Sequence, residues 1–129
     1  MEITYQLDII PDTDQIIDVY NSSGINRPTA DKERIKKMYD NSNLVATAWD
    51  NGTLVGISRS LTDFCYCCYL AVKQEYKSKG IEKKLIELTK EKIGGQTMLL
   101  LLSAQTAMEY YPKVGFQKVD NGFVIKRTK

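Results

Sequence analysis

The sequence predicts an α/β fold, in the form of an α+β layered arrangement with a mixed, mostly antiparallel sheet and helices on both faces. Three observations predict it. Strand-like runs fill residues 44–72, a helix with apolar residues at helical spacing follows over 80–93, and the unbroken apolar run 98–102 is typical of a strand buried on both faces. No linker, internal repeat or low-complexity segment interrupts residues 1–129, so we expect a single domain.

The first forty residues predict one strand and two helices. Side chains alternate between apolar and polar over 3–9, as they do in a strand with one buried face. A helix is expected after Asp12, a residue type that caps helices, and it reaches about Tyr20. A second helix is expected from near Thr29 to about Tyr39, with its apolar residues on one side.

The middle of the chain predicts three successive strands. The runs 44–49 and 53–60 flank Asp50-Asn51-Gly52, whose Asn-Gly step tolerates positive φ and favours a hairpin. The run 64–72 alternates on two faces that both contain apolar side chains, which predicts a buried third strand. The helix over 80–93 then ends at Gly94-Gly95.

The last thirty residues predict a strand, a short helix and a hairpin. The strand is the run 98–102, and a helix over 104–111 is expected to end at Pro112, which cannot continue it. The runs 116–119 and 123–126 are expected to pair through an Asp-Asn-Gly turn.

The composition excludes several classes of protein. The formal net charge is +2, from 18 basic and 16 acidic residues, so the overall charge demands neither nucleic acid nor an anionic membrane as partner. No run approaches the roughly 18 apolar residues of a membrane span, and the first residues do not have the pattern of a signal peptide. We therefore expect a cytoplasmic protein.

Cysteine and histidine content limits the available chemistry. The three cysteines, Cys65, Cys67 and Cys68, lie within four residues, and the chain contains no histidine that could complete a zinc site. We expect reduced thiols and no metal. Without an imidazole base, catalysis must use carboxylates, tyrosines, thiols or water, and small thiols inside a strand are more often packing groups than nucleophiles.

The segment from Leu70 to Lys83 has the features of an anion site. A buried strand ending at Val72 leads through a polar loop, expected to begin at Lys73, into a helix whose first amide groups are free to bind phosphate. Gly80 permits close approach of a ligand, and several lysines add positive charge, although lysines on a helix often form only its solvated face. The segment matches neither the phosphate loop of nucleotide triphosphatases nor the glycine-rich dinucleotide fingerprint.

A second pattern identifies a family. The residues Ala107, Tyr110, Tyr111, Gly115 and Phe116 fit an Ala-x-x-aromatic-Tyr-x-x-x-Gly-Phe pattern, and this resembles the GNAT (GCN5-related) N-acetyltransferases, as a small single-domain bacterial-type member. The order of strands and helices is similar to that family too. The resemblance covers about 44–123.

The phosphate-binding motif of the same family is matched in part. Leu70, Val72 and Gly80 fit its pattern, whereas Gln74 stands in place of a proline and Lys77 in place of glutamine or arginine. Glu82 stands in place of a small residue, and a carboxylate near a pyrophosphate opposes binding. Its placement near a helix N-terminus is nevertheless favourable for the helix itself.

The resemblance implies acetyl-CoA as cosubstrate and assigns roles to single residues. The Val72 N–H would stabilise the oxyanion, and Tyr111 would protonate the departing thiolate. The backbone of Leu70 and Ala71 would pair with pantetheine. The phosphates would lie on the segment formed by Lys77, Ser78, Lys79, Gly80, Ile81, Glu82 and Lys83.

The implied reaction is direct transfer of acetyl to a primary amine, on a small molecule or a protein. An alternative is a catalytically weakened GNAT-fold protein that binds CoA as a sensor or serves as an interaction module. The proton acceptor for the amine stays open among Asp63, Tyr66, Glu109 and a water chain. The resemblance and the exposed edges of a small sheet also predict a homodimer.

Overall fold

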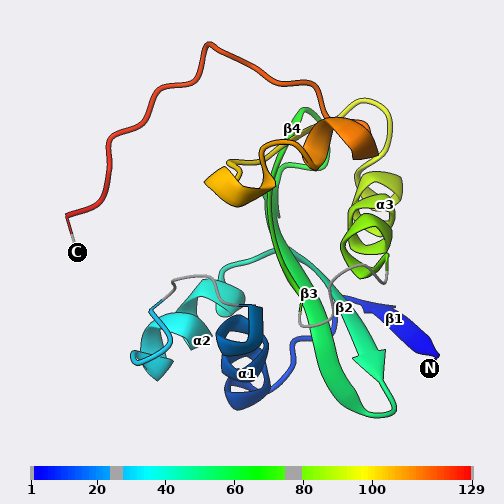
Figure 1. Cartoon of the computed structure of the whole chain (residues 1–129), viewed down its shortest axis with the longest axis vertical. Coiled ribbons are helices and arrows are strands. Elements are labelled where there is room, and N and C mark those ends of the chain that lie inside the picture. Colours follow the sequence, from blue (N-terminus) through cyan, green and yellow to red (C-terminus); the bar gives the residue numbers. More distant parts are fainter. Residues whose placement is uncertain (1, 24–27, 75–79, 129) are drawn as a thin grey trace.

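The computed structural model of the chain describes residues 2–23, 28–74 and 80–128 (Figure 1). It contains a single five-stranded sheet and three α-helices in the order that the sequence predicts. The elements are β1 (Ile3–Leu7), α1 (Thr13–Ser23), α2 (Lys32–Asp40), β2 (Leu44–Asp50), β3 (Thr53–Thr62), β4 (Cys67–Gln74), α3 (Ile81–Ile93) and β5 (Met98–Leu100).

The sheet has the strand order β1-β2-β3-β4-β5, so every strand lies beside its neighbour in sequence. The first three pairings are antiparallel, and β4 and β5 pair in parallel. The helix α3 connects these two parallel strands, as a crossover must. The predicted mixed, mostly antiparallel sheet is therefore confirmed.

The two faces of the sheet are covered by different helices. On one face α1 and α2 bury a cluster that includes Ile16, Ile35 and Ile57, and the hydroxyl groups of Tyr20 and Tyr39 lie 2.7 Å apart within it. Figure 1 shows α1 and α2 together on one side of the strands and α3 on the other. The sheet is thus the middle of three layers.

The face under α3 positions the functional residues of β4. Its buried cluster includes Leu70, Val72, Ile81 and Leu85. The helix approaches the sheet closely at Gly56, where an added Cβ would lie 2.7 Å from the Ile81 side chain. A side chain at this position would push the start of α3 away from β4.

The turn between β2 and β3 confirms the predicted hairpin. Asn51 and Gly52 have φ values of 51° and 87°, and Asp50 pairs with Thr53 across the turn. Both central residues therefore adopt the left-handed conformation that a tight two-residue hairpin turn requires.

Two sequence predictions for single elements are wrong in detail. The run 104–111 forms no α-helix; two short 3-10 turns, Gln105–Ala107 and Tyr111–Val114, take its place, with Pro112 inside the second. Proline in an α-helix would clash with the carbonyl four residues earlier, and so short a run gains little from helix propagation. The third strand begins at Cys67 because Asp63 folds the preceding residues into a loop.

The hairpin expected over 116–126 is also absent. Residues 117–128 have no regular secondary structure, and β5 ends at Leu100, before the predicted end of its run at Leu102. A hairpin of two strands is marginal in water unless it packs against other elements. In this single chain the segment does not pack against β5.

Candidate functional site

The centre of the candidate site is the place where β4 and β5 stop pairing. Their ladder begins with Cys67 beside Met98 and ends with Tyr69 beside Leu100, although β4 continues to Gln74. The last residues of β4 therefore lose their neighbour on this side, within the described part of the chain.

The alternation of the ladder shows which backbone groups face this gap. The Met98 N–H donates to the Tyr66 C=O at 2.8 Å, and in a parallel ladder every second residue directs both of its backbone groups to the same neighbour. Even-numbered residues of β4 therefore face β5, and odd-numbered ones face β3. By this count the N–H and C=O of Val72 point into the gap, while its side chain lies in the core under α3.

Lys73 is a functional candidate that sequence reasoning missed. It was assigned to the polar loop, but it lies in β4, is buried, and donates from Nζ to the Val72 C=O at 3.0 Å. The ammonium group thus supplies a partner to a carbonyl that β5 no longer reaches. The sequence offered one signal for this burial, since Lys73 directly follows residues that were predicted to lie in a buried strand.

Tyr111 occupies a defined, half-buried position at the start of the second 3-10 turn. Its ring packs edge-on against the rings of Tyr110 and Phe116, at centroid distances of 5.3 and 5.5 Å. It also packs against the cluster under α3, which brings it to the same face as Val72. Burial, and after it the charge of Glu82, raises the pKa of Tyr111 above its ordinary value. The hydroxyl is therefore protonated at neutral pH and acts as a donor.

The acceptor of that hydroxyl is Glu82. Tyr111 Oη donates to Glu82 Oε1 at 2.9 Å, across 29 positions of sequence. Glu82 lies in the first turn of α3, two residues after Gly80. The hydrogen bond therefore connects Tyr111, the expected acid, with Glu82, the carboxylate that departs from the family's phosphate motif.

The described part of the expected phosphate segment is the start of α3. Gly80 caps the helix with a φ of 72° and no side-chain hydrogen bond, and there is open space where a Cβ would lie. The Ile81 side chain is buried, and Lys83 is exposed beside Glu82. The first amide groups of a helix have no acceptor within the helix itself, and an anion site uses such groups. Lys77, Ser78 and Lys79 lie outside the described residues.

The candidates for the proton acceptor are not gathered at the gap. Asp63 Oδ1 accepts from the backbone N–H groups of Cys65, Tyr66 and Cys67, and these bonds lower its pKa, so it is a weak base. The side chain of Tyr66 is exposed. Both residues precede β4, about 17 Å along the strand from Val72. Glu109 is exposed, which leaves it and water as candidates.

The cysteines show no sign of nucleophilic chemistry. Cys68 is buried, and burial raises the pKa of its thiol, which lowers the thiolate fraction. All three cysteines are free thiols. Among the residues that the structure describes, no cluster of cysteines and carboxylates could hold a metal ion.

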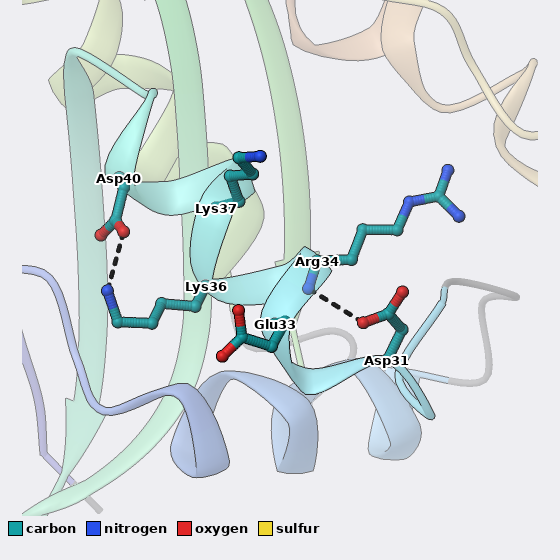
Figure 2. A pocket seen from close by; sticks show the side chains of 6 residues that line it. All are labelled: Asp31, Glu33, Arg34, Lys36, Lys37 and Asp40. Carbon is teal, nitrogen blue, oxygen red and sulfur yellow. Dashed lines mark hydrogen bonds and ion pairs between the residues drawn. The ribbon is translucent and has the colours of Figure 1, made fainter.

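A surface hollow of about 430 Å³ lies over α2 and does not involve the β4–β5 gap (Figure 2). Two of its charged side chains pair with each other, since Lys36 forms an ion pair with Asp40 at 2.8 Å. The Asp31 carboxylate accepts from the backbone N–H of Arg34 at the start of the helix. The hollow is therefore a charged surface along one helix. It is lined by Asp31, Glu33, Arg34, Lys36, Lys37 and Asp40.

Comparisons with known proteins bear on the family and on the fold. A sequence model of the acetyltransferase (GNAT) domain matches residues 16–127. No curated protein matches the sequence. Within the described ranges, no helix is both long and apolar enough to cross a membrane.

Several solved structures share the fold. SA2161 of meticillin-resistant Staphylococcus aureus, a probable acetyltransferase, is 18% identical with a TM-score of 0.82, covering 98% of this chain and 100% of its own. A predicted acetyltransferase from Clostridium acetobutylicum, solved with acetyl-CoA, is 15% identical with a TM-score of 0.70, covering 97% and 96%. The aminoglycoside N-acetyltransferase AAC(6')-Iy, solved with CoA, is 9% identical with a TM-score of 0.71, covering 99% and 96%.

Proposed function

Since this chain belongs to the GNAT family of acetyltransferases, we propose that it transfers acetyl from acetyl-CoA to a primary amine by direct attack of that amine. The observation that carries the proposal is the end of the β4–β5 ladder at Tyr69 and Leu100, which leaves the backbone of Val72 facing an open gap. We further propose that residues 1–129 act as a single cytoplasmic domain, with the acceptor amine on a small molecule or a protein.

The gap supplies hydrogen-bonding groups where the reaction needs them. When the amine attacks the thioester carbonyl, a C–N bond forms and negative charge develops on the carbonyl oxygen. The Val72 N–H is the proposed donor to this oxygen. The backbone of Leu70, an even-numbered residue that faces the side of β5, is proposed to hold pantetheine. Ala71 pairs with Arg59 of β3, so by the same count its backbone groups face β3 and it drops out of the expected set. The buried Lys73 ammonium, 3.0 Å from the Val72 carbonyl oxygen, adds positive charge beside the next peptide group of the strand.

The phosphates of the cosubstrate are proposed to bind at the start of α3. The positive end of the helix dipole after Gly80 and the exposed Lys83 favour an anion there. The remaining proposed ligands, Lys77, Ser78 and Lys79, directly precede Gly80 in the sequence and lie outside the described residues. Glu82 opposes this binding through its charge.

Tyr111 is the proposed acid. As the C–S bond breaks, its hydroxyl gives a proton to the departing thiolate, and the amine passes its own proton to water or Glu109. A tyrosine of ordinary pKa, about 10, is already a weaker acid than a thiol of pKa about 8.5. Because burial and Glu82 raise the pKa of Tyr111 further, full transfer is uphill and must accompany C–S cleavage.

A second function follows from one observation, the Tyr111–Glu82 hydrogen bond. While the hydroxyl donates to the carboxylate, it does not donate to a thiolate. The same carboxylate weakens binding of CoA phosphates. Slow proton delivery to the thiolate and weak CoA binding are both expected of a catalytically weakened protein that serves as a CoA sensor or an interaction module.

Calorimetry with acetyl-CoA and a thiol-release assay separate the two functions. The enzyme is expected to bind acetyl-CoA with micromolar affinity and to release CoA thiol when a suitable amine is present. The amines to be tested are a polyamine, an aminoglycoside, a small monoamine and a lysine peptide. Micromolar binding with no release for any amine favours the sensor, and absence of binding refutes both.

A further inference from the structure

The β4–β5 gap opens onto both faces of the sheet, and the two faces differ. Tyr111 and the start of α3 lie on the face where the Val72 side chain is buried. Since side chains alternate along a strand, those of Tyr69, Ala71 and Lys73 lie on the opposite face. The phosphates of the cosubstrate and the acid are proposed for the first face. The acceptor amine is therefore expected to reach the thioester from the second face, on which α1 and α2 lie (Figure 1).

A buried positive charge stands at the margin of the gap on this second face. Lys73 is only 7% exposed, and its Nζ donates to the Val72 C=O at 3.0 Å. Since that carbonyl points into the gap, the ammonium group lies beside the proposed place of the thioester. A buried ammonium group favours a negatively charged neighbour and disfavours a second cation. An acceptor with a carboxylate near its amine therefore fits this margin better than a polyamine does.

An apolar surface continues from the gap along the second face. Tyr69 pairs with Leu61 of β3 and with Leu100 of β5, and directly opposite residues of paired strands share a face. Met98 lies two residues before Leu100 and therefore on the same face. Leu61 and Met98 are 48% and 53% exposed, and Tyr69 and Leu100 are half-buried. These four side chains form the Tyr69 surface, which is accessible to an apolar group.

The helices α1 and α2 leave the Tyr69 surface open. Within the described residues, the buried cluster under these helices includes residues of β2 and β3, such as Val45 and Ile57, and none of β4 or β5. Figure 1 shows both helices beside the half of the sheet that contains the β2–β3 turn, while β3 and β4 continue beyond them. Accessible apolar side chains next to a single charged group are typical of a small-molecule site.

One small molecule can reach the cation, the gap and the Tyr69 surface together. Ala71 lies midway between Tyr69 and Lys73, about 7 Å along the strand from each, and its small side chain is half-buried. The gap begins beside Ala71, because the pairing of β4 with β5 ends at Tyr69. An α-amino acid carries its amine, carboxylate and side chain on one carbon. Placed over Ala71, it directs the amine to the gap, the carboxylate to Lys73 and the side chain to Tyr69.

We propose that the acceptor is an apolar α-amino acid, that Lys73 selects its carboxylate, and that the Tyr69 surface holds its side chain. This inference rests on the proposed acetyl transfer, because it names the acceptor for the same site. The amine forms a C–N bond with the thioester carbonyl carbon and the C–S bond breaks. The departing thiolate takes its proton from Tyr111, which regains one from solvent, and the amine gives a proton to water or Glu109. The products are an N-acetyl amino acid and CoA.

The test is a thiol-release assay on the unsubstituted protein with a matched set of amines. L-Phenylalanine has both the carboxylate and the apolar body, its amide replaces the carboxylate by a neutral group, and L-alanine lacks the apolar body. The kcat/KM for phenylalanine is expected to exceed that for the amide and that for alanine by about 10- to 100-fold. The amine of the amide loses its proton more readily, so reactivity alone favours the opposite order.

The outcomes separate this inference from the proposed acetyl transfer. Efficient acetylation of spermidine, or equal kcat/KM for phenylalanine and its amide, overturns the inference and leaves acetyl transfer in place. Calorimetric titration of L-phenylalanine into the protein, with and without CoA, gives a readout that needs no turnover. Binding of phenylalanine but not of its amide, without acetylation of either, supports the amino-acid site and counts against acetyl transfer. If phenylalanine is neither bound nor acetylated, the inference is wrong.

The variant Lys73→Met tests the role of the ammonium group, since methionine keeps an unbranched side chain and removes the charge. It is expected to raise KM for phenylalanine about 10- to 100-fold and to leave KM for the amide unchanged. Far-ultraviolet circular dichroism checks that the variant is folded. Lys92→Met, which removes an exposed lysine near the end of α3, is the matched control and should keep the preference for phenylalanine. An equal rise of KM for both substrates means that Lys73 has only a structural role, and it overturns the inference.

Discussion

Replacing Glu82 by glutamine removes one negative charge from the first turn of α3 and keeps a side chain that still accepts from the Tyr111 hydroxyl. If the pyrophosphate of CoA lies on the amide groups of this turn, the carboxylate lies about 6 Å from it. Two unit charges at that distance repel by up to about 3 kcal/mol at an effective dielectric constant near 20. Partial exposure of Glu82 and the nearby Lys83 reduce this to roughly 1 to 2 kcal/mol.

The expected result is that Glu82→Gln binds acetyl-CoA about 5- to 30-fold more tightly at low salt, by calorimetric titration. The gain should shrink at high salt, where screening already weakens the repulsion. Dephospho-CoA keeps the pyrophosphate and should show nearly the full gain. Pantetheine has no pyrophosphate and should show almost none.

Glu82→Gly is a less clean variant, since glycine inside a helix costs about 1 kcal/mol of stability. It also removes the partner of Tyr111. Comparing it with Glu82→Gln separates loss of charge from loss of the hydrogen bond. If neither variant tightens CoA, or if pantetheine gains as much as CoA, the phosphates do not bind at the start of α3 and the reasoning is refuted.

The same variant has a readout without any ligand. The charge of Glu82 is one cause of the raised pKa of Tyr111, after burial. Glu82→Gln should therefore lower that pKa, measured by the ultraviolet absorbance of the phenolate in an alkaline titration. Tyr111→Phe identifies which transition belongs to this residue. An unchanged transition would mean that the hydrogen bond at 2.9 Å does not persist in solution.

Three further predictions concern single side chains. Tyr111→Phe should keep CoA affinity and lower turnover about 100-fold or more, because only the proton delivered to the thiolate is lost; unchanged turnover with a competent amine removes Tyr111 from the mechanism. Lys73→Met should lower the free energy of unfolding by about 1 to 3 kcal/mol in urea titrations, since the Val72 carbonyl loses its donor, and equal stability contradicts that role. Gly56→Ala should destabilise by about 1 to 3 kcal/mol, as its Cβ would meet Ile81 at 2.7 Å, and it should also weaken CoA binding by moving the start of α3.

Much of the fold could be predicted because its signals are local. The Asn51-Gly52 step alone specifies the β2–β3 hairpin, since few residue pairs adopt positive φ twice. The period of apolar residues specifies α3, and the unbroken apolar run specifies β5. The α-helix predicted over 104–111 is absent although its local composition favours a helix. The run is too short, and Pro112 cannot continue it.

The site was less predictable because it depends on contacts between distant residues. Tyr111 and Glu82 are 29 positions apart, and only the packing of the 3-10 turns against α3 brings them together. Lys73 was misassigned because a charged residue after a strand usually begins a loop. Its burial follows from the early end of the β4–β5 ladder, which no single residue reveals.

The enzyme and the sensor proposals differ in whether the Tyr111 hydroxyl can leave the Glu82 carboxylate. The hydroxyl must leave the carboxylate before it can donate to a thiolate. Burial and, after it, the charge of Glu82 raise the pKa of Tyr111, so the hydroxyl keeps its proton in the bonded state. Phosphates arriving at the start of α3 repel the carboxylate, so binding of the cosubstrate itself favours release of the hydroxyl. Under the enzyme proposal, the repulsion between Glu82 and the CoA phosphates weakens CoA binding, and the same repulsion favours breaking the Tyr111–Glu82 hydrogen bond. Glu82→Gln, which keeps an acceptor for the hydroxyl, should then bind CoA more tightly without a matching rise in turnover. In a protein locked by this bond, Glu82→Gly, which removes the acceptor, should raise both.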